Sequence, residues 1–391
     1  MLRFQTAGES HGQALVAILS GMPAGLRVDF EYVNRELKRR QGGYGRGGRM
    51  KIESDTAQFL SGVRHGLTIG SPITLLVANH DWENWKESLA VEDRPETRAK
   101  HKALTRPRPG HADLAGCLKY NFREARYVLE RASARETAAR VAAGAVAKLF
   151  LKEFSVEVAS HVVAVGSVAL KDEPVSFQKV LALRAIEEPL LGCVDPAVGA
   201  RMKEEVDKAL EARDTVGGTF EVIAHGVPPG LGSCAQWDER LDGQLAQAVM
   251  SIQAVKAVEI GGGVRAAASV GSQVHDEIGY DREKSRFTRT SNRAGGLEGG
   301  MSNGEDIVVR GYLKPISTLR RPLESVDFET KETVKAAYER SDVCVVPAAG
   351  VVGEAMVALT LSRSFLEKFG GDSIGETKRN FFAFMEQVRR F

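Results

Sequence analysis

Two histidines stand in short segments rich in glycine and proline, where an imidazole is well placed to move a proton. His11 lies in GESHG near the N-terminus, and His111 lies with Arg108 in the turn RPRPGHAD. Because imidazole titrates near neutral pH, either ring could transfer a proton or contact an anion. A surface histidine in a turn fits the first segment equally well. The prolines hold the second segment rigid, so His111 is the better candidate for protonating a leaving group.

Arginines concentrate in another segment, whose backbone is rich in glycine. Arg39 and Arg40 precede QGGYGRGGRM, which adds Arg46 and Arg49. Guanidinium groups bind carboxylates and phosphates through paired N–H donors, and glycines let the backbone wrap around a ligand. We therefore interpret the segment as a loop over a small anionic ligand. A solvated basic loop and an RNA-binding RGG-like segment stay open as alternatives, although Tyr44 is its only aromatic residue.

Two further segments could hold a phosphate. RASARET, which contains Arg131, Ser133 and Arg135, opens a helical pattern where free backbone N–H groups and the helix dipole attract anions. KPIST (314–318) follows a strand-like run and offers a lysine with two hydroxyls. A capped helix or a strand end that binds no ligand has the same sequence pattern, so this alternative stays open. The chain has neither a GxGxxG fingerprint in its strand–helix context nor a P-loop, which disfavours the conventional dinucleotide fold.

Strand-like and helix-like segments alternate along the chain and must position these residues. The apolar patterns predict strands at 14–20, 72–78 and 307–313 and helices at 29–40, 133–151, 176–187 and 198–213. Asp29 is expected to cap the first helix. Ser133 and Glu136 have the spacing of a capping box for the second.

Short motifs of the first half recur in the second half in the same order. The pairs are GMPAGL (21–26) with GVPPGL (226–231), GVR…GS at 62–71 with 263–272, Glu130-Arg131 with Glu339-Arg340, and FLKEF (150–154) with FLEKF (365–369). We interpret this as an internal duplication, with halves of about 1–154 and 215–369, inside a single domain of residues 1–391. A site between the halves would draw residues from both, especially Arg131 and Arg340.

Composition narrows the class of protein. The chain is 43% hydrophobic and 27% charged, as soluble globular proteins are. Its 53 basic and 51 acidic residues leave a net charge of +2, which favours neither nucleic acid nor a membrane as partner. The four cysteines lie far apart with no zinc-site spacing, which predicts a reduced, cytoplasmic protein without a structural metal. Neither a signal peptide nor a run of about eighteen apolar residues is present.

Taken together, these segments resemble the chorismate synthase family. GESHG, RRQGGYGRGGRM, RPGHAD, RASARET, NRAGG, KPIST and ERSD stand in that family's order between residues 1 and about 363. The resemblance implies an α+β fold, a single large β-α-β sandwich, assembled as a homotetramer. It also implies a lyase of the shikimate pathway to aromatic amino acids. Such an enzyme converts 5-enolpyruvylshikimate-3-phosphate to chorismate and phosphate by anti-1,4 elimination and needs reduced FMN.

The resemblance also implies roles for individual residues. His11 would lie near the flavin, His111 would protonate the departing phosphate, and Asp342 would help the flavin accept the substrate proton. Ser10 and Ser133 would order this network. Flavin contacts are implied for Arg131, Ala132, Ser133, Gln253, Ala254, Gly299, Lys314, Pro315, Ile316, Ser317, Thr318 and Arg340. The candidates for NADP or substrate anions are Arg40, Arg46, Arg49, Arg108 and Arg135.

Two positions depart from the family pattern, and one rival activity stays open. Many relatives have asparagine where this chain has Gln253 and proline where it has Val343. The chief alternative is a flavin-dependent oxidoreductase that uses the same loops for net hydride transfer. A lyase would form product without consuming reductant, so stoichiometry separates the two. Whether NADPH reduces the flavin on this protein also stays open.

Overall fold

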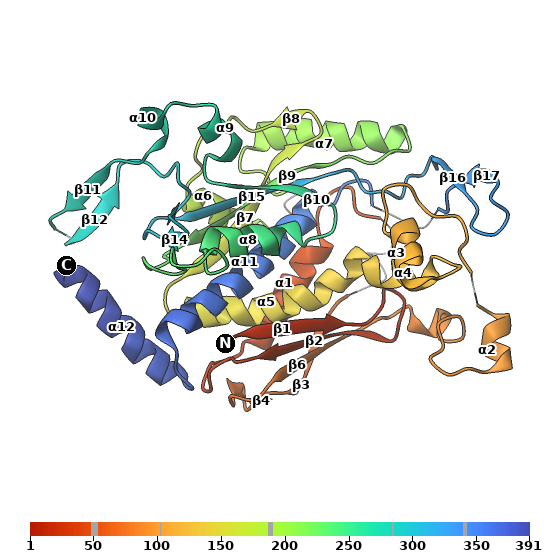
Figure 1. The fold of residues 1–391 in the computed structure, drawn as a ribbon, viewed down its shortest axis with the longest axis horizontal. Coiled ribbons are helices and arrows are strands. Elements are labelled where there is room, and N and C mark those ends of the chain that lie inside the picture. Colours follow the sequence, from red (N-terminus) through yellow and green to blue (C-terminus); the bar gives the residue numbers. More distant parts are fainter. Residues whose placement is uncertain (48–53, 102, 187–190, 284, 339–341) are drawn as a thin grey trace.

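The computed structural model describes residues 1–47, 54–101, 103–186, 191–283, 285–338 and 342–391. Two antiparallel sheets lie on either side of a layer of helices (Figure 1). The first sheet has the strand order β1 (Arg3–Ala7), β2 (Ala14–Ser20), β6 (Ile73–Ala78), β3 (Ala57–Ser61). The second has the order β10 (Val255–Ile260), β15 (Ile307–Leu313), β9 (Gly218–His225), β7 (Glu157–Val165), β8 (Val168–Ala169).

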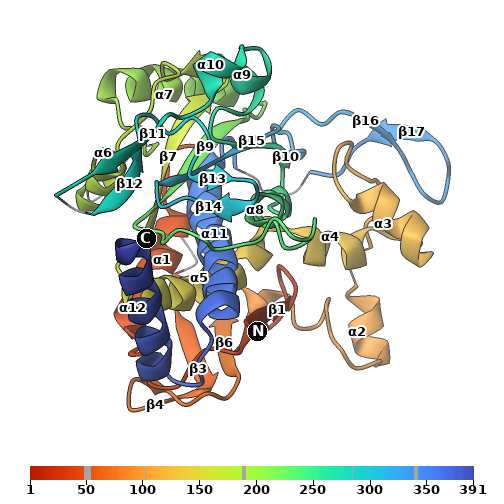
Figure 2. The same ribbon diagram turned by 60° about the vertical axis from the view of Figure 1, so that its left-hand side comes forward.

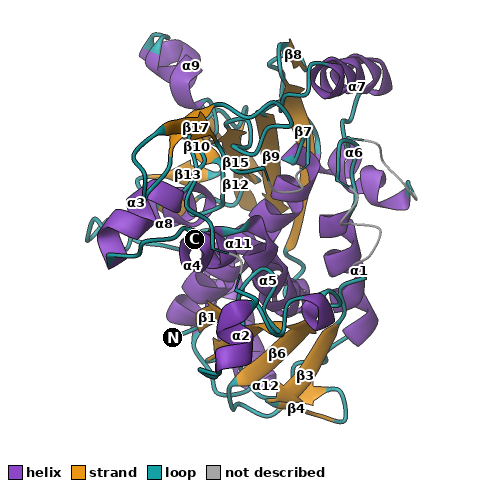
Figure 3. Ribbon diagram, turned by 90° about the vertical axis from the view of Figure 1, so that its right-hand side faces the viewer, coloured by secondary structure: helices purple, strands orange, loops and turns teal. Residues whose placement is uncertain are grey.

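Four helices fill the space between the sheets, as Figure 3 shows from the side: α1 (Phe30–Gln41), α5 (Thr137–Lys152), α8 (Leu241–Met250) and α11 (Val346–Phe369). Smaller helices surround this core: α2 (Pro95–Ala99), α3 (Asp113–Tyr120), α4 (Arg126–Ala132), α6 (Phe177–Ala182), α7 (Pro196–Glu211), α9 (Gly263–Ala267), α10 (Gly271–Val274) and α12 (Ile374–Arg390). Single turns of 3₁₀ helix are η2 (Trp82–Asn84), η3 (Ala134–Glu136) and η4 (Leu183–Ala185). Four short hairpins complete the described chain: β4 (Val63–Arg64) with β5 (Leu67–Thr68), β11 (Ile278–Asp281) with β12 (Arg286–Arg289), β13 (Leu297–Glu298) with β14 (Met301–Ser302), and β16 (Glu324–Val326) with β17 (Thr333–Lys335).

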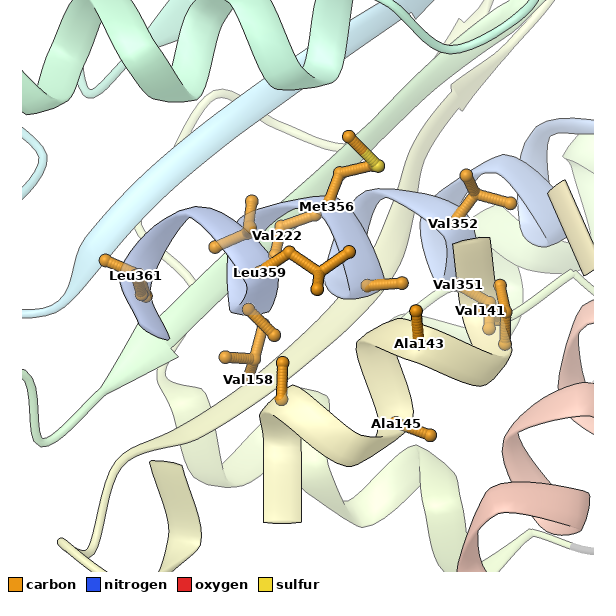
Figure 4. Packing of buried hydrophobic residues seen from close by; sticks show 14 of the residues in the cluster. Val141, Ala143, Ala145, Val158, Val222, Val351, Val352, Met356, Leu359 and Leu361 are labelled. Carbon is orange, nitrogen blue, oxygen red and sulfur yellow. The ribbon is translucent and has the colours of Figure 1, made fainter. Parts of the chain in front are cut away.

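The pair of helices α5 and α11 forms the centre of the core. Helix α5 packs on β2 and β6 of the first sheet, and α11 packs on β7 and β9 of the second. Figure 4 shows buried side chains of the two helices in contact, with Val141 of α5 beside Val351 of α11 and Ala143 pointing toward α11. Gly144 permits this approach, because a Cβ there would lie 2.3 Å from the Cβ of Ala355.

Helix α11 is apolar around most of its circumference, which is the pattern of a helix with neighbours on all sides. By length and composition it would also suffice to cross a membrane, but 83% of its apolar window is buried inside the protein. It is therefore the core helix of this fold.

The predicted elements are largely present. Strands β2 and β15 have the predicted bounds, and Asp29 caps α1, with its Oδ1 accepting the backbone N–H of Tyr32 at 2.9 Å. The predicted capping box of Ser133 and Glu136 does not open the α-helix, which begins one turn later. Ser133 caps η3 instead, accepting the N–H of Arg135, and the α-helix begins only at Thr137. The reason is that residues 134–136 take the tighter 3₁₀ form that is common at helix starts.

A mixed helix and sheet fold is confirmed, whereas the internal duplication stays a prediction. GMPAGL follows β2 and GVPPGL follows β9, and FLKEF and FLEKF close α5 and α11. The GVR…GS pair takes different structures, because residues 62–71 contain β4 and β5 while 263–272 contain α9. Glu339 and Arg340 lie outside the described residues. One buried apolar cluster extends from Leu2 to Phe381 and joins both halves.

Candidate active site

A cavity of about 410 Å³ lies where the end of α1, the η3 turn and the start of α11 meet. This volume is within the range of about 300–1,000 Å³ that is usual for small-molecule sites. Of the residues predicted from the sequence, it is lined by Arg40, Arg46, Ser133, Arg135, Gln253 and Asp342. The rest of its described lining is Gly47, Ala134, Thr137, Ile252, Arg320, Tyr338, Val345, Ala348, Ala349 and Val352.

Two buried arginines on this cavity share one carboxylate. Asp55 accepts Nη1 of Arg135 at 2.6 Å and Nη1 of Arg40 at 3.5 Å. The Nε atoms donate elsewhere, from Arg40 to Thr137 Oγ1 at 2.9 Å and from Arg135 to Asn79 Oδ1 at 3.0 Å. Among the described residues, two guanidinium groups therefore face a single buried carboxylate on this wall of the cavity.

Arg46 and Asp342 form an ion pair on another wall. Arg46 Nη1 lies 2.7 Å from Asp342 Oδ2, and the backbone N–H of Gly47 donates to Asp342 Oδ1. The backbone N–H of Val343 donates to the carbonyl of Gly45 at 2.8 Å. The glycine-rich segment thus brings an arginine to an aspartate almost three hundred residues away in the chain.

The described part of the glycine-rich segment is anchored rather than solvated. Tyr44 donates its hydroxyl to Asp207 Oδ1 on α7 at 2.6 Å, and the ammonium of Lys203 lies 4.5 Å from the centre of the Tyr44 ring. Gly45 has φ +85°, and a Cβ there would lie 2.9 Å from Val206 Cγ1. The glycine is therefore required both by its backbone conformation and by close packing.

The turn that carries His111 forms a second cluster. His111 Nδ1 lies 2.5 Å from Oδ1 of the buried Asp113, whose Oδ2 accepts Arg108 Nε at 2.9 Å. Arg108 Nη2 lies 3.1 and 3.3 Å from the two ring nitrogens of His111. Burial alone would raise the pKa of Asp113, but the hydrogen bonds from His111 and Arg108 outweigh it and hold this pKa well below its ordinary value.

The KPIST segment packs directly against this turn. Lys314 Nζ donates to the carbonyl of Gly110 at 2.7 Å, and Arg108 Nη1 donates to Thr318 Oγ1 at 3.0 Å. Burial lowers the pKa of Lys314. Two residues beyond Thr318, Arg320 lines the cavity. The segment therefore connects the His111 cluster with the cavity wall.

His11 belongs to a third cluster, beside the helix α4. Glu130 receives the backbone N–H of His11 at 2.8 Å and lies 3.0 Å from its Nδ1, and the ring stacks on Trp85 with centroids 4.1 Å apart. The backbone N–H of the buried Ser10 donates to the Glu130 carbonyl. Burial would raise the pKa of Glu130, but hydrogen bonds and charge from His11, helped by Arg126, lower it. In the described part of the chain, neither His11 nor His111 is among the residues that line the cavity.

The remaining predicted residues are dispersed. The guanidinium of Arg131 donates to the carbonyls of Thr6 and Gly8 and so holds β1. Ala132 ends α4, and Gly299 stands in the turn between β13 and β14. The carbonyl of Ala254 accepts the N–H of Lys314, which joins the segment after α8 to KPIST. Arg49 and Arg340 lie outside the described residues.

Some lining residues were not found from the sequence. Ile252, Ala348, Ala349 and Val352 form an apolar wall, and no pattern distinguishes them from other core residues. Arg320 had a signal, because it follows the predicted phosphate segment by two positions. Asp55 carried no signal in the sequence, and Glu130 was noted only in the repeated Glu-Arg pair; both are identified as site residues by their partners.

Comparison with known proteins assigns the family. The model of the chorismate synthase family matches residues 2–366. The chain belongs to this family. It is 66% identical to chorismate synthase of Acidobacterium capsulatum, over the whole length of both chains. Identity to the Aquifex aeolicus enzyme is 55%, covering all of this chain and 99% of that protein.

A solved structure agrees with this assignment. A crystal structure of chorismate synthase superimposes with a TM-score of 0.80 at 44% identity, covering 100% of this chain and 99% of that one. The resemblance inferred from the motifs is thereby confirmed.

Proposed function

We propose that this chain converts 5-enolpyruvylshikimate-3-phosphate to chorismate and phosphate by anti-1,4 elimination, with reduced FMN as cofactor. Its membership of the chorismate synthase family supports the reaction. As part of the same proposal, the protein acts in the cytoplasm, in the shikimate pathway, as a homotetramer.

The observation that carries the proposal is the charge of the cavity. Its described lining, together with Asp55, contains four arginines but two aspartates: Arg40, Arg46, Arg135 and Arg320 against Asp55 and Asp342. The proposed substrate carries two carboxylates and a phosphate. Because arginine binds both groups through paired N–H donors, the four guanidinium groups of the described lining favour such an anion.

The residues present also fit a flavin. Gln253 lines the cavity, and its buried Oε1 has no hydrogen-bond partner among the described residues. A ring N–H of a bound cofactor would satisfy this acceptor, which otherwise costs about 1–3 kcal/mol. Ile252 and Val352 offer the apolar surface that an aromatic ring needs. Glutamine at position 253 can therefore serve where many relatives have asparagine.

Different residues of the chain would hold the proton-transfer groups that the reaction needs. When bound, reduced FMN supplies an electron-rich ring beside the bond that breaks. Arg46 and the N–H of Gly47 hold the carboxylate of Asp342 at the cavity wall, where it can assist the transfer of the substrate proton. In this proposal Asp113 orients the His111 ring, and His111 protonates the departing phosphate from the turn that KPIST joins to the cavity wall, since His111 itself is not part of the cavity lining.

Stoichiometry tests the proposal. Under anaerobic conditions, photoreduced FMN is supplied in substoichiometric amount, and the chorismate and phosphate released per flavin are counted. We expect many products per flavin, with the flavin still reduced at the end. One product for each flavin oxidised would replace the lyase with an oxidoreductase. Full activity with oxidised FMN, or without FMN, would refute the cofactor's role.

A further inference from the structure

One arginine of the cavity has no hydrogen-bond or ion-pair partner among the described residues. Arg320 lines the cavity and is exposed, and among the described residues it makes no hydrogen bond or ion pair. Arg46, by contrast, pairs with Asp342, and Arg135 pairs with Asp55. Within the described part of the chain, the N–H donors of the Arg320 guanidinium are therefore left for a ligand.

The backbone around Arg320 is held on both sides. Thr318 receives a hydrogen bond from the buried Arg108, and the backbone N–H of Arg321 donates to the carbonyl of Arg213 at 3.1 Å. A side chain on an anchored backbone loses less conformational freedom when it binds. The position is thus favourable for recognition, although the side chain itself reaches solvent.

Tyr338 lines the same cavity from the other end of the segment that begins at Thr318. It is half-exposed, and its hydroxyl has no hydrogen-bond partner in the described part of the chain. Its backbone is anchored through the N–H of Ala337, which donates to the carbonyl of Arg106. Between the two ends, β16 and β17 extend outward beside α3, as Figure 2 shows. The segment 318–338 therefore leaves the cavity after Arg320 and returns to it at Tyr338.

We propose that Arg320 and Tyr338 form a rim subsite for a phosphate monoester dianion. The two side chains offer a guanidinium fork and a hydroxyl, which are donors that match phosphate oxygens. The apolar wall of Ile252 and Val352 suits a ring, whereas the exposed rim suits the hydrated, doubly charged end of a ligand. This inference rests on the proposed function, in which FMN and the substrate each carry such a phosphate.

Binding measurements on the full-length protein test the subsite without relying on turnover. Arg320→Gln and Tyr338→Phe are compared with Arg321→Gln, which removes the same charge at a neighbouring position outside the cavity lining. FMN and riboflavin are titrated by flavin fluorescence, and 5-enolpyruvylshikimate-3-phosphate is titrated into flavin-free protein by calorimetry. Riboflavin lacks the phosphate and reports on the ring alone.

We expect Arg320→Gln to raise the Kd of one phosphate monoester about tenfold, as the loss of a hydrogen bond to a charged group does. Tyr338→Phe should raise the same Kd by a smaller factor, and Arg321→Gln should leave it within about twofold. A higher Kd for FMN with an unchanged Kd for riboflavin assigns the rim to the flavin phosphate. A change for the shikimate ester alone assigns it to the substrate phosphate.

Three results would overturn the subsite: both Kd values unchanged in Arg320→Gln, an equal loss for riboflavin, or an equal loss in Arg321→Gln. A wild-type protein that binds neither phosphate ester would overturn it as well. Failure of the proposed function is distinguishable, because it appears as binding without any release of chorismate by the wild-type protein.

Discussion

His111 and Asp113 are predicted to act as a single proton-transfer unit. Removing the ring by His111→Ala should lower kcat about 10²–10⁴-fold, the usual contribution of one general acid, which corresponds to about 2.7–5.4 kcal/mol. Asp113→Asn keeps a group of the same shape but removes the charge that binds the ring and Arg108. Because Asp113 is the carboxylate that pairs with the buried Arg108 in the described part of the chain, we expect a loss of stability of about 3–5 kcal/mol.

This loss is smaller than the total stability of most domains, about 5–15 kcal/mol, so the Asp113→Asn variant should remain folded at low temperature. Turnover is therefore measured anaerobically with reduced FMN at temperatures where circular dichroism shows the native signal. The double variant is the decisive measurement. If Asp113 acts only through His111, the double variant should be no slower than His111→Ala alone, since residues of one unit are not additive.

His101→Ala provides the matched control. His101 also pairs with a carboxylate, Glu124, at 2.6 Å, but it belongs to neither the cavity lining nor the His111 turn. Its loss should leave kcat within about threefold of the wild type, well below the effect of a general acid. Our reasoning fails if His111→Ala loses less than tenfold, if the control loses as much, or if the effects of the two single variants multiply in the double variant.

Three other predictions concern binding, packing and pH. Arg46→Ala should reduce kcat/KM about 10–100-fold, measured at temperatures where circular dichroism shows the native signal, because the Arg46–Asp342 pair is mostly buried and its loss also destabilises the fold; unchanged kinetics would return the segment to a structural role. Gly144→Ala should destabilise the fold by about 1–3 kcal/mol through overpacking against Ala355, whereas the open Gly375→Ala in α12 should not, as denaturant titrations would show. The folded-state pKa of Asp113 lies below its ordinary value of 3.8, so its stabilising contribution is complete above that pH and declines as pH falls below it. Denaturant titrations at successive pH values should therefore show the stability advantage of wild type over Asp113→Asn narrowing only below about pH 4; a constant difference would contradict this assignment.

Much of the local structure could be predicted from the sequence. Apolar periodicity over a few residues predicts the strands β2 and β15 and the helix α7. The cap at Asp29 is equally local, because its side chain accepts a backbone N–H three residues away. The motifs also identified the family, because their residues and their order can be read from the sequence without a structure. What limited the helix prediction was the first turn, where Ser133 can cap either a 3₁₀ or an α turn and only packing selects between them.

Which residues share the cavity was decided by tertiary structure. The sequence identified Arg40, Arg46 and Arg135 as anion-binding candidates but could not show that Asp55 lies between two of them.

Helix packing similarly places Glu354, fully buried in α11, against Arg39 and Lys148, where the charges of the cations lower its pKa well below the ordinary value against the effect of burial. Any of the 51 acidic residues could have been the partner of a given arginine. The energies of such pairs depend on burial and distance, and both are set only when segments hundreds of residues apart are packed together.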